Sequence, residues 1–184
     1  ITVYDDWTFD ESSINSQRHQ LNLDSINFAN LSVVKTKAAS EIIYKNTGLI
    51  TNILPDCLWF KSEKPINKIH YPFKVSWFGM NTNHTTINEI LPSLEALNEK
   101  IYLNIITNKF EQLQKIIESK NYLNLQCKFT IWTPEFNYDL LKSDVVVIPY
   151  SSDNIRLVKS ANRIVDTMNL GRFVIMSNAE QFNE

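Results

Sequence analysis

The stretch from Tyr150 to Val174 carries the side chains whose types and spacing best suit the binding of an anion. We expect residues 154–170 to form one helix, on which residues three, four and seven positions apart share a face. The polar residues with this spacing are Lys159, Asn162, Arg163 and Asp166. Lys159 and Arg163 are like charges one turn apart, which repel by roughly 0.2–0.5 kcal/mol when nothing lies between them. A bound anion would relieve that repulsion.

The start of the same predicted helix adds further groups that bind phosphate. Arg156 lies there, just after the polar run of residues 151–154. The first N–H groups of a helix are unpaired and lie at the positive end of its dipole. A guanidinium adds two parallel donors to a phosphate. These features favour a phosphate site, and the alternative is a solvated helix face with an Arg163–Asp166 ion pair and an ordinary capping loop.

The second half of the chain predicts the sheet that positions this helix. Strands are expected at 74–78, 101–107, 127–132, 144–149 and 173–176, and helices at 86–98, 109–120, 136–142 and 154–170. Such alternation is typical of a Rossmann-like α/β fold, a parallel sheet with helices on both faces. Ligands of these sheets bind beyond the carboxyl ends of the strands, where the strand order reverses. This rule indicates the loops after Phe78, Trp132 and Pro149.

The first part of the chain predicts a piece of a second α/β domain. Short strands are expected at 1–4, 31–34 and 52–54, and helices at 15–28 and 37–46, the latter capped by Thr36 and ended by Gly48. Residues 56–72 have neither helical nor strand periodicity and are interpreted as a linker. We therefore expect two domains, residues 1–70 with the linker and residues 71–184.

Composition excludes several classes of function. The 184 residues are 43% hydrophobic and 21% charged with a net charge of -2, which is ordinary for a globular protein and unlike a nucleic-acid binder. No apolar run is long enough for a membrane span, which leaves only peripheral membrane contact. Cys57 and Cys127 have no metal-ligand spacing, so we expect a reduced, cytoplasmic setting and no metal. The three glycines form neither GxGxxG nor GxxxxGK[ST], which argues against dehydrogenases and P-loop NTPases.

The order of short motifs in the second half resembles the donor-binding domain of GT-B glycosyltransferases. The matching words are Ser-Asp-Val-Val-Val-Ile-Pro, then Lys-Ser-Ala-Asn-Arg, then Leu-Gly-Arg-Phe-Val-Ile. The resemblance is closest to the retaining group that includes sucrose and glycogen synthases. Asp-Thr-Met-Asn-Leu-Gly-Arg-Phe-Val matches the family's Glu-Ala-Met-Ala-x-Gly-x-Pro-Val-like segment, with Asp166 in place of the second glutamate. The resemblance implies that Asp166 holds the ribose and that Arg156, Lys159 and Arg163, with Asn162, hold the diphosphate.

The sequence departs from the family pattern at two places. The first glutamate of the family's motif aligns near Val158, and the arginine that often follows the first strand's glycine is replaced by Met80 after Gly79. Gly79 still allows the backbone to approach a phosphate, and His84 is a candidate replacement for the missing base, although a surface histidine is the simpler interpretation. Thr133, in the loop after Trp132, is the candidate contact to the nucleobase.

The resemblance extends to the front half, where Val-Tyr-Asp-Asp-Trp and Ile-Leu-Pro-Asp are similar to segments late in the family's acceptor domain. It implies a transferase that moves a sugar from a nucleotide diphosphate sugar, with no other cofactor, to a glycan, lipid or protein acceptor. The family's early acceptor domain has no counterpart in these residues, so we expect a fragment that is inactive by itself. Asp5 and Asp6 could be read as a metal or acid–base pair, but adjacent strand residues point to opposite faces, which favours a structural role.

Two other functions fit parts of the sequence. A non-catalytic α/β module that binds nucleotides or acts as a scaffold would explain the missing glutamate and the missing arginine. A flavodoxin- or receiver-like domain would need several acids at strand ends, and only Asp144 and the distant pair Asp5 and Asp6 are available.

Overall fold

The computed structural model describes residues 2–4, 17–97, 99–150 and 159–178. The chain divides into two compact units, which are considered one at a time. The first comprises residues 1–57, 151–162 and 178–184, and the second comprises residues 58–150 and 163–177. Within the described residues, no helix combines the length and the apolar character needed to cross a bilayer.

The first unit contains a small parallel sheet with helices. Its strands β1 (Thr2–Tyr4), β2 (Ser32–Val34) and β3 (Asn52–Ile53) lie in the order β1-β2-β3, with helices α1 (Gln17–Phe28) and α2 (Lys37–Thr47). Its buried core is formed by Ile26, Val34 and Ile43. The predicted caps of α2 are confirmed: the Thr36 hydroxyl accepts from the Ala39 amide at 3.2 Å, and Gly48 is left-handed with φ 73°.

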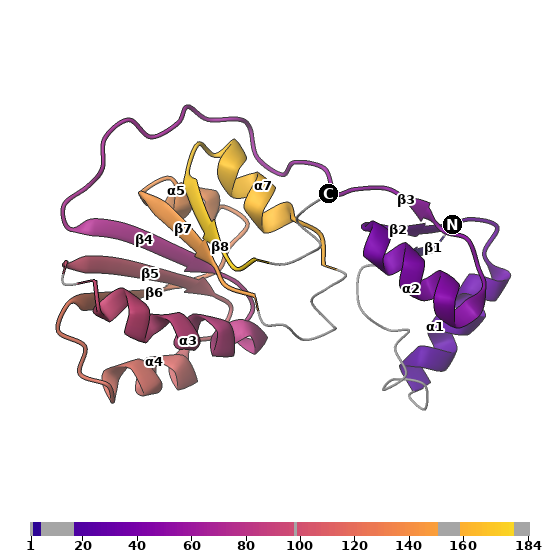
Figure 1. Cartoon of the computed structure of the whole chain (residues 1–184), viewed down its shortest axis with the longest axis horizontal. Coiled ribbons are helices and arrows are strands. Elements are labelled where there is room, and N and C mark those ends of the chain that lie inside the picture. The colour runs from indigo at the N-terminus through magenta and orange to yellow at the C-terminus, as the bar shows by residue number, and fades with distance from the viewer. Residues whose placement is uncertain (1, 5–16, 98, 151–158, 179–184) are drawn as a thin grey trace. The chain divides into compact units, whose positions relative to one another are not determined.

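The second unit is built on a parallel sheet of five strands (Figure 1). The strands are β4 (Phe73–Phe78), β5 (Ile101–Thr107), β6 (Leu125–Ile131), β7 (Val145–Ile148) and β8 (Phe173–Met176). Their order is β6-β5-β4-β7-β8. The chain moves outward from β4 to β6 and then returns to the other side of β4. The strand order therefore reverses between β4 and β7, which is the switch point where such sheets bind ligands.

Helices cover both faces of this sheet, as predicted for a Rossmann-like fold. Figure 1 shows α3 (His84–Glu95) and α4 (Glu111–Glu118) on one side, and α5 (Asn137–Leu140) and α7 (Asn162–Asn169) on the other. A 3₁₀ turn at Asn81–Asn83 leads into α3. The sheet and its helices therefore have the Rossmann-like arrangement that the sequence predicted.

Apolar side chains from the central strands and α3 form the core of the second unit. Trp77, Leu103 and Ile105 are fully buried and pack with Ile87 and Leu91 of α3. Each such side chain contributes roughly 1.5–3 kcal/mol by leaving water. This burial fixes which strands are central, and it thereby fixes where the switch point lies.

The predicted helix over 154–170 is wrong in its extent. Among the described residues it begins at Asn162, and residues 159–161 are not helical. The Ser160 hydroxyl donates to Asp56 Oδ2 at 2.5 Å and also contacts Asn162 Oδ1, and such local side-chain bonds compete with the helix. Lys159 and Arg163 are consequently not one helical turn apart, and the argument from their repulsion does not hold.

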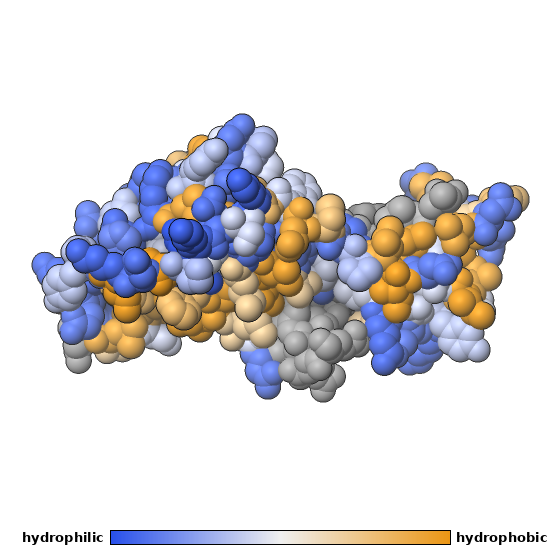
Figure 2. Space-filling model, turned by 90° about the horizontal axis from the view of Figure 1, so that it is seen from above, coloured by the Kyte–Doolittle hydropathy of each residue, from blue (hydrophilic) through white to orange (hydrophobic). Residues whose placement is uncertain are grey.

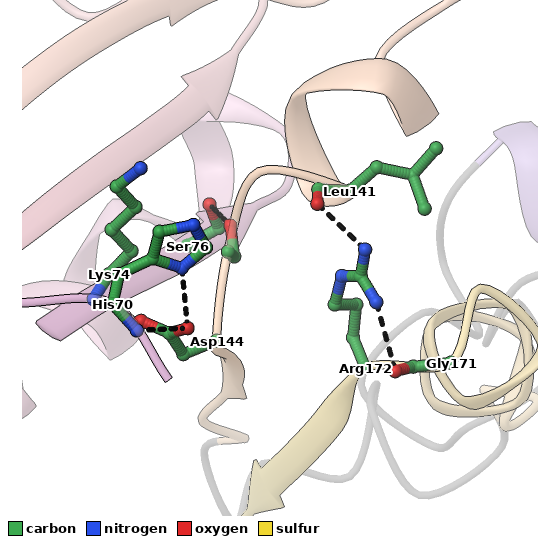
Figure 3. A network of polar contacts seen from close by, with 8 residues as sticks. His70, Lys74, Ser76, Leu141, Asp144, Gly171 and Arg172 are labelled. Atoms are coloured by element: carbon green, nitrogen blue, oxygen red, sulfur yellow. Dashed lines mark hydrogen bonds and ion pairs between the residues drawn. The ribbon is translucent and has the colours of Figure 1, made fainter. Parts of the chain in front are cut away.

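A buried carboxylate, Asp144, forms hydrogen bonds at the end of the sheet where β4 and β7 begin (Figure 3). Asp144 is 1% exposed and accepts three hydrogen bonds, from the Lys74 amide at 2.8 Å, the His70 amide at 3.0 Å and His70 Nδ1 at 2.7 Å. Burial opposes ionisation of Asp144, but the bonds from Lys74 and His70 outweigh it and hold its pKa below the usual value.

This lowered pKa predicts how stability depends on pH. Because the folded pKa lies below the unfolded one, the contribution of Asp144 is complete above the unfolded pKa and is lost as pH falls through the folded pKa. We expect Asp144→Asn to lower the free energy of unfolding at pH 7 by about 1–3 kcal/mol and to flatten its loss in acid. Urea titrations at several pH values measure both effects. Asp139→Asn is the matched control, because Asp139 bonds to Lys142 at the surface. If the free energy of unfolding fell equally with acid in wild type and in Asp144→Asn, the lowered pKa would not belong to Asp144.

Candidate functional site

Arg163 lies at the switch point of the sheet, at the carboxyl ends of β4 and β7. Its Nη1 donates to the backbone carbonyl of Phe78, the last residue of β4, at 2.9 Å. Its Cζ lies 5.9 Å from the ring centroid of Phe78 and 5.1 Å from that of Tyr150, which follows β7. Both distances are in the range of cation–π attraction. The second unit thus holds a fixed positive charge where doubly wound sheets bind their ligands.

Gly79 makes room for this arginine. A Cβ at Gly79 would lie 2.9 Å from the ring of the buried Trp77 and 3.2 Å from Arg163 Nη1. The Gly79 amide donates to the Ile106 carbonyl at 3.1 Å. The sequence indicated a glycine that brings backbone close to a phosphate. The structure places Gly79 beside the guanidinium of Arg163, and its N–H is bonded within the sheet.

Polar side chains follow β4 and β5 at the same edge. The Asn81 amide donates to Asn108 Oδ1 at 2.8 Å, and Asn108 Nδ2 donates to Asn81 Oδ1 at 3.3 Å. His84 Nε2 lies 3.3 Å from the Thr107 hydroxyl. Burial lowers the pKa of His84, which favours its neutral form and weakens it as a substitute for the missing base. Sequence reasoning missed the Asn81–Asn108 pair, since no spacing relates two residues that lie on separate loops.

Aromatic rings extend from the switch point towards the end of β6. The ring of Phe136 lies 5.1 Å from that of Phe78, 5.2 Å from that of Phe60 and 5.8 Å from that of Trp132. Phe78 and Phe136 are buried, whereas Trp132 is 41% exposed. Thr133, the predicted contact to the base, is exposed beside Trp132, and its carbonyl accepts from the Phe136 amide at 3.1 Å.

The segment of residues 58–66, which we call the strap, is fastened to α7 and to the turn after it. The Trp59 amide donates to Asp166 Oδ1 at 3.1 Å, and Asn169 Nδ2 donates to the Phe60 carbonyl at 2.5 Å. The Glu63 amide bonds to the Asn169 carbonyl, and the Ile66 amide to the Gly171 carbonyl. The strap has no regular secondary structure, as predicted for this part of the chain.

The predicted site residues come from several segments of the chain, and the structure describes all of them except Arg156. It brings Gly79 and Arg163 together at the switch point. It places Asp166, 8% exposed, against the strap. Lys159 and Asn162 belong to the first unit, where Asn162 contacts Ser160 and both residues are half-buried. Arg156 lies outside the described residues, as do Asp5 and Asp6.

Comparisons with known proteins bear on the fold. No family model matches the sequence, and no curated protein matches it. Among solved structures, the chain resembles the crystal structure of TarM, a glycosyltransferase, with a TM-score of 0.69 and 16% identity. The chain therefore has the fold of part of a GT-B protein. The likeness covers 97% of this chain but only 36% of TarM, so the chain spans about a third of the length of the protein it resembles.

The turn that ends α7 of this GT-B fold predicts a strict requirement for glycine. Gly171 is left-handed with φ +66°, and a Cβ there would lie 2.3 Å from the Lys64 carbonyl oxygen in the strap. Gly171→Ala should destabilise the second unit by roughly 1–3 kcal/mol and speed amide hydrogen exchange at Glu63 and Ile66. Gly48→Ala is the matched control, because Gly48 has φ +73° but nothing within 4 Å of its Cβ. Unchanged exchange at Glu63 and Ile66 in Gly171→Ala would show that this contact does not hold the strap.

Proposed function

We propose that the chain is part of a glycosyltransferase that uses a nucleotide diphosphate sugar, and that the diphosphate binds at Arg163. The observation that carries the proposal is the guanidinium of Arg163 beside the carboxyl ends of β4 and β7 in a GT-B fold. In such sheets the crevice at the point of strand reversal is the general ligand site.

The contacts of Arg163 suit it to stabilise charge on a leaving group. A guanidinium carries five N–H donors, so the bond to the Phe78 carbonyl does not exhaust it. The rings of Phe78 and Tyr150 lie within cation–π range of the group and hold it at the switch point before any ligand arrives. Negative charge develops on the diphosphate as the sugar leaves, and a positioned donor stabilises that charge without reorganising at the moment of reaction.

Arg163 also accounts for a departure from the family pattern. The arginine that often follows the glycine of this loop is replaced by Met80 here. Arg163 Nη1 lies 3.2 Å from the position that a Cβ of Gly79 would occupy. A guanidinium from α7 therefore supplies positive charge to the Gly79 loop, which the loop itself does not provide.

The finer parts of the proposal rest on the resemblance to the family. They are the retaining course of the reaction, a glycan, lipid or protein acceptor, a role in polysaccharide synthesis, a cytoplasmic location with peripheral membrane contact, and the absence of any further cofactor or metal. In the same proposal Arg156, Lys159 and Asn162 complete the diphosphate site, and Thr133 contacts the base.

A non-catalytic nucleotide-binding or scaffolding module is the second candidate, and a specific observation favours it. Arg163 and Asp166 both have protein partners, the Phe78 carbonyl and the Trp59 amide. Both side chains could therefore serve the fold alone. A scaffolding module would bind no nucleotide, so a binding measurement distinguishes it from the proposed transferase. A nucleotide-binding module would bind the nucleotide but transfer no sugar, so the transfer activity of the full-length protein distinguishes that alternative.

Removal of the guanidinium tests the proposal. At least one of UDP, GDP and ADP should raise the melting temperature of the wild-type chain, and inorganic pyrophosphate added separately should do the same, because a ligand of the native state stabilises it. In Arg163→Ala the affinity for both should fall about ten-fold or more, since a hydrogen bond to a charged group contributes roughly 1.5–3 kcal/mol. Isothermal titration calorimetry gives the dissociation constants, and melting without ligand shows whether the variant is folded.

Two further variants make that test specific. Arg163→Lys keeps the charge but loses the planar fork, so it should bind with intermediate affinity. Lys120→Ala removes one cation between α4 and β6, at the opposite edge of the sheet, and should bind like wild type. Binding that is unaffected in a folded Arg163→Ala protein would refute the site. A lack of binding by every nucleotide and by pyrophosphate would favour the scaffolding module.

Asp166 allows a separate prediction about the ribose. If the Asp166 carboxylate binds the ribose hydroxyls, Asp166→Ala should weaken the binding of a nucleoside diphosphate by about 0.5–1.5 kcal/mol or more. The binding of pyrophosphate should be unchanged. Calorimetry with the two ligands measures the difference. Equal loss for both ligands, with faster amide exchange at Trp59, would assign Asp166 to the strap instead of the ribose.

A further inference from the structure

Trp132 stands out among the exposed apolar residues because of its position. Exposed apolar side chains are common on this surface, and Figure 2 shows groups of hydrophobic residues beside hydrophilic ones. Exposure alone therefore argues for nothing. Trp132, however, follows β6 directly, and its amide donates to the Thr107 carbonyl at the end of β5 at 2.9 Å. Its backbone is thus fixed at the edge of the sheet that carries Arg163.

The ring of Trp132 packs against the buried ring of Phe136. Its centroid lies 5.8 Å from that of Phe136 at an interplanar angle of 34°, and Phe136 is 8% exposed. Phe136 in turn packs against Phe78 and Phe60. A large ring that is supported from behind and 41% exposed loses little conformational freedom when a flat ligand covers it.

The same rings connect Trp132 with the guanidinium of Arg163. Arg163 Cζ lies 5.9 Å from the ring of Phe78, that ring lies 5.1 Å from Phe136, and Phe136 lies 5.8 Å from Trp132. A cation that suits phosphate and an exposed indole that suits an aromatic ring therefore occupy one edge of one sheet. A nucleoside diphosphate carries phosphate groups at one end and an aromatic base at the other.

We infer that the indole of Trp132 is the stacking platform for the nucleobase of the donor. The inference rests on the proposed function and adds to it a part for a side chain that no motif singles out. Stacking accepts any base, because every base has an aromatic face. Base selectivity must then come from groups at the rim of the platform, and the exposed Thr133 next to Trp132 is placed for that role.

The test compares ligands that have a base with one that has none. UDP, GDP, ADP and inorganic pyrophosphate are titrated calorimetrically into the wild-type chain and into Trp132→Ala, Trp132→Phe and Tyr138→Ala. The dissociation constant of the nucleoside diphosphates should rise about ten-fold or more in Trp132→Ala, the usual range for loss of one base–aromatic stack. Pyrophosphate should bind this variant as it binds wild type. Trp132→Phe keeps an aromatic face and should recover most of the loss.

Tyr138→Ala is the matched control for removal of an exposed ring. Tyr138 is 63% exposed on α5, two residues from the buried Phe136 and Leu140, so it does not face the aromatic cluster. It should bind every ligand like wild type. Melting without ligand establishes that each variant is folded.

The outcomes separate the inference from the function on which it rests. Unchanged nucleoside diphosphate binding in Trp132→Ala would overturn the platform and leave the diphosphate site at Arg163 intact. Equal loss of nucleoside diphosphate and pyrophosphate would also overturn it, since the effect would not depend on the base. Failure of wild type to bind any of the four ligands would remove the proposed function and the platform together.

Discussion

The contact between Arg163 and the end of β4 is the interaction on which the candidate site depends. It requires that β4 and β7 be neighbours, that α7 begin beside them, and that Gly79 carry no side chain. The first condition is set by burial, because Trp77 and Val147 lie in the apolar core that makes these strands central. The charge at the switch point is therefore positioned by the same packing that stabilises the sheet.

The β4–β7 pair is short and is reinforced at both ends. Its register pairs Val75 with Val145 and Ser76 with Val146, whereas β4 and β5 pair along the whole of β4. At the beginning of the two strands, Asp144 accepts from Lys74 and His70, and the Asp144 amide donates to the Lys74 carbonyl (Figure 3). At their other end lies Arg163. Side-chain bonds thus supply the rigidity that a ladder of this length does not provide, and rigidity is what a preorganised anion site requires.

The sequence predicted the strands and helices well because their signals are local. The strands at 101–107 and 173–176 have the predicted bounds, and the left-handed Gly48 and Gly171 follow helices as expected. The start of α7 could not be predicted, because Ser160 bonds to Asp56, a residue 104 positions earlier. The strap is a similar case. Its lack of periodicity indicated a linker, and nothing in its composition indicated that Asp166 and Asn169 would hold it.

Motif and geometry give different weight to the candidate residues. Asp166 and Gly171 carry the resemblance to the family's donor-binding segment, yet in this chain both serve the strap, one as an acceptor and one by having no side chain. Those two positions would be constrained in a protein that bound no nucleotide, so their presence does not by itself argue for a donor site. Arg163 differs, because the fold does not need a guanidinium to satisfy one carbonyl of β4, and water or a neutral donor could do so. A cation within reach of two rings at the switch point offers an anion a partner that the fold does not require, and for this reason Arg163 is the strongest support for a donor site in this chain.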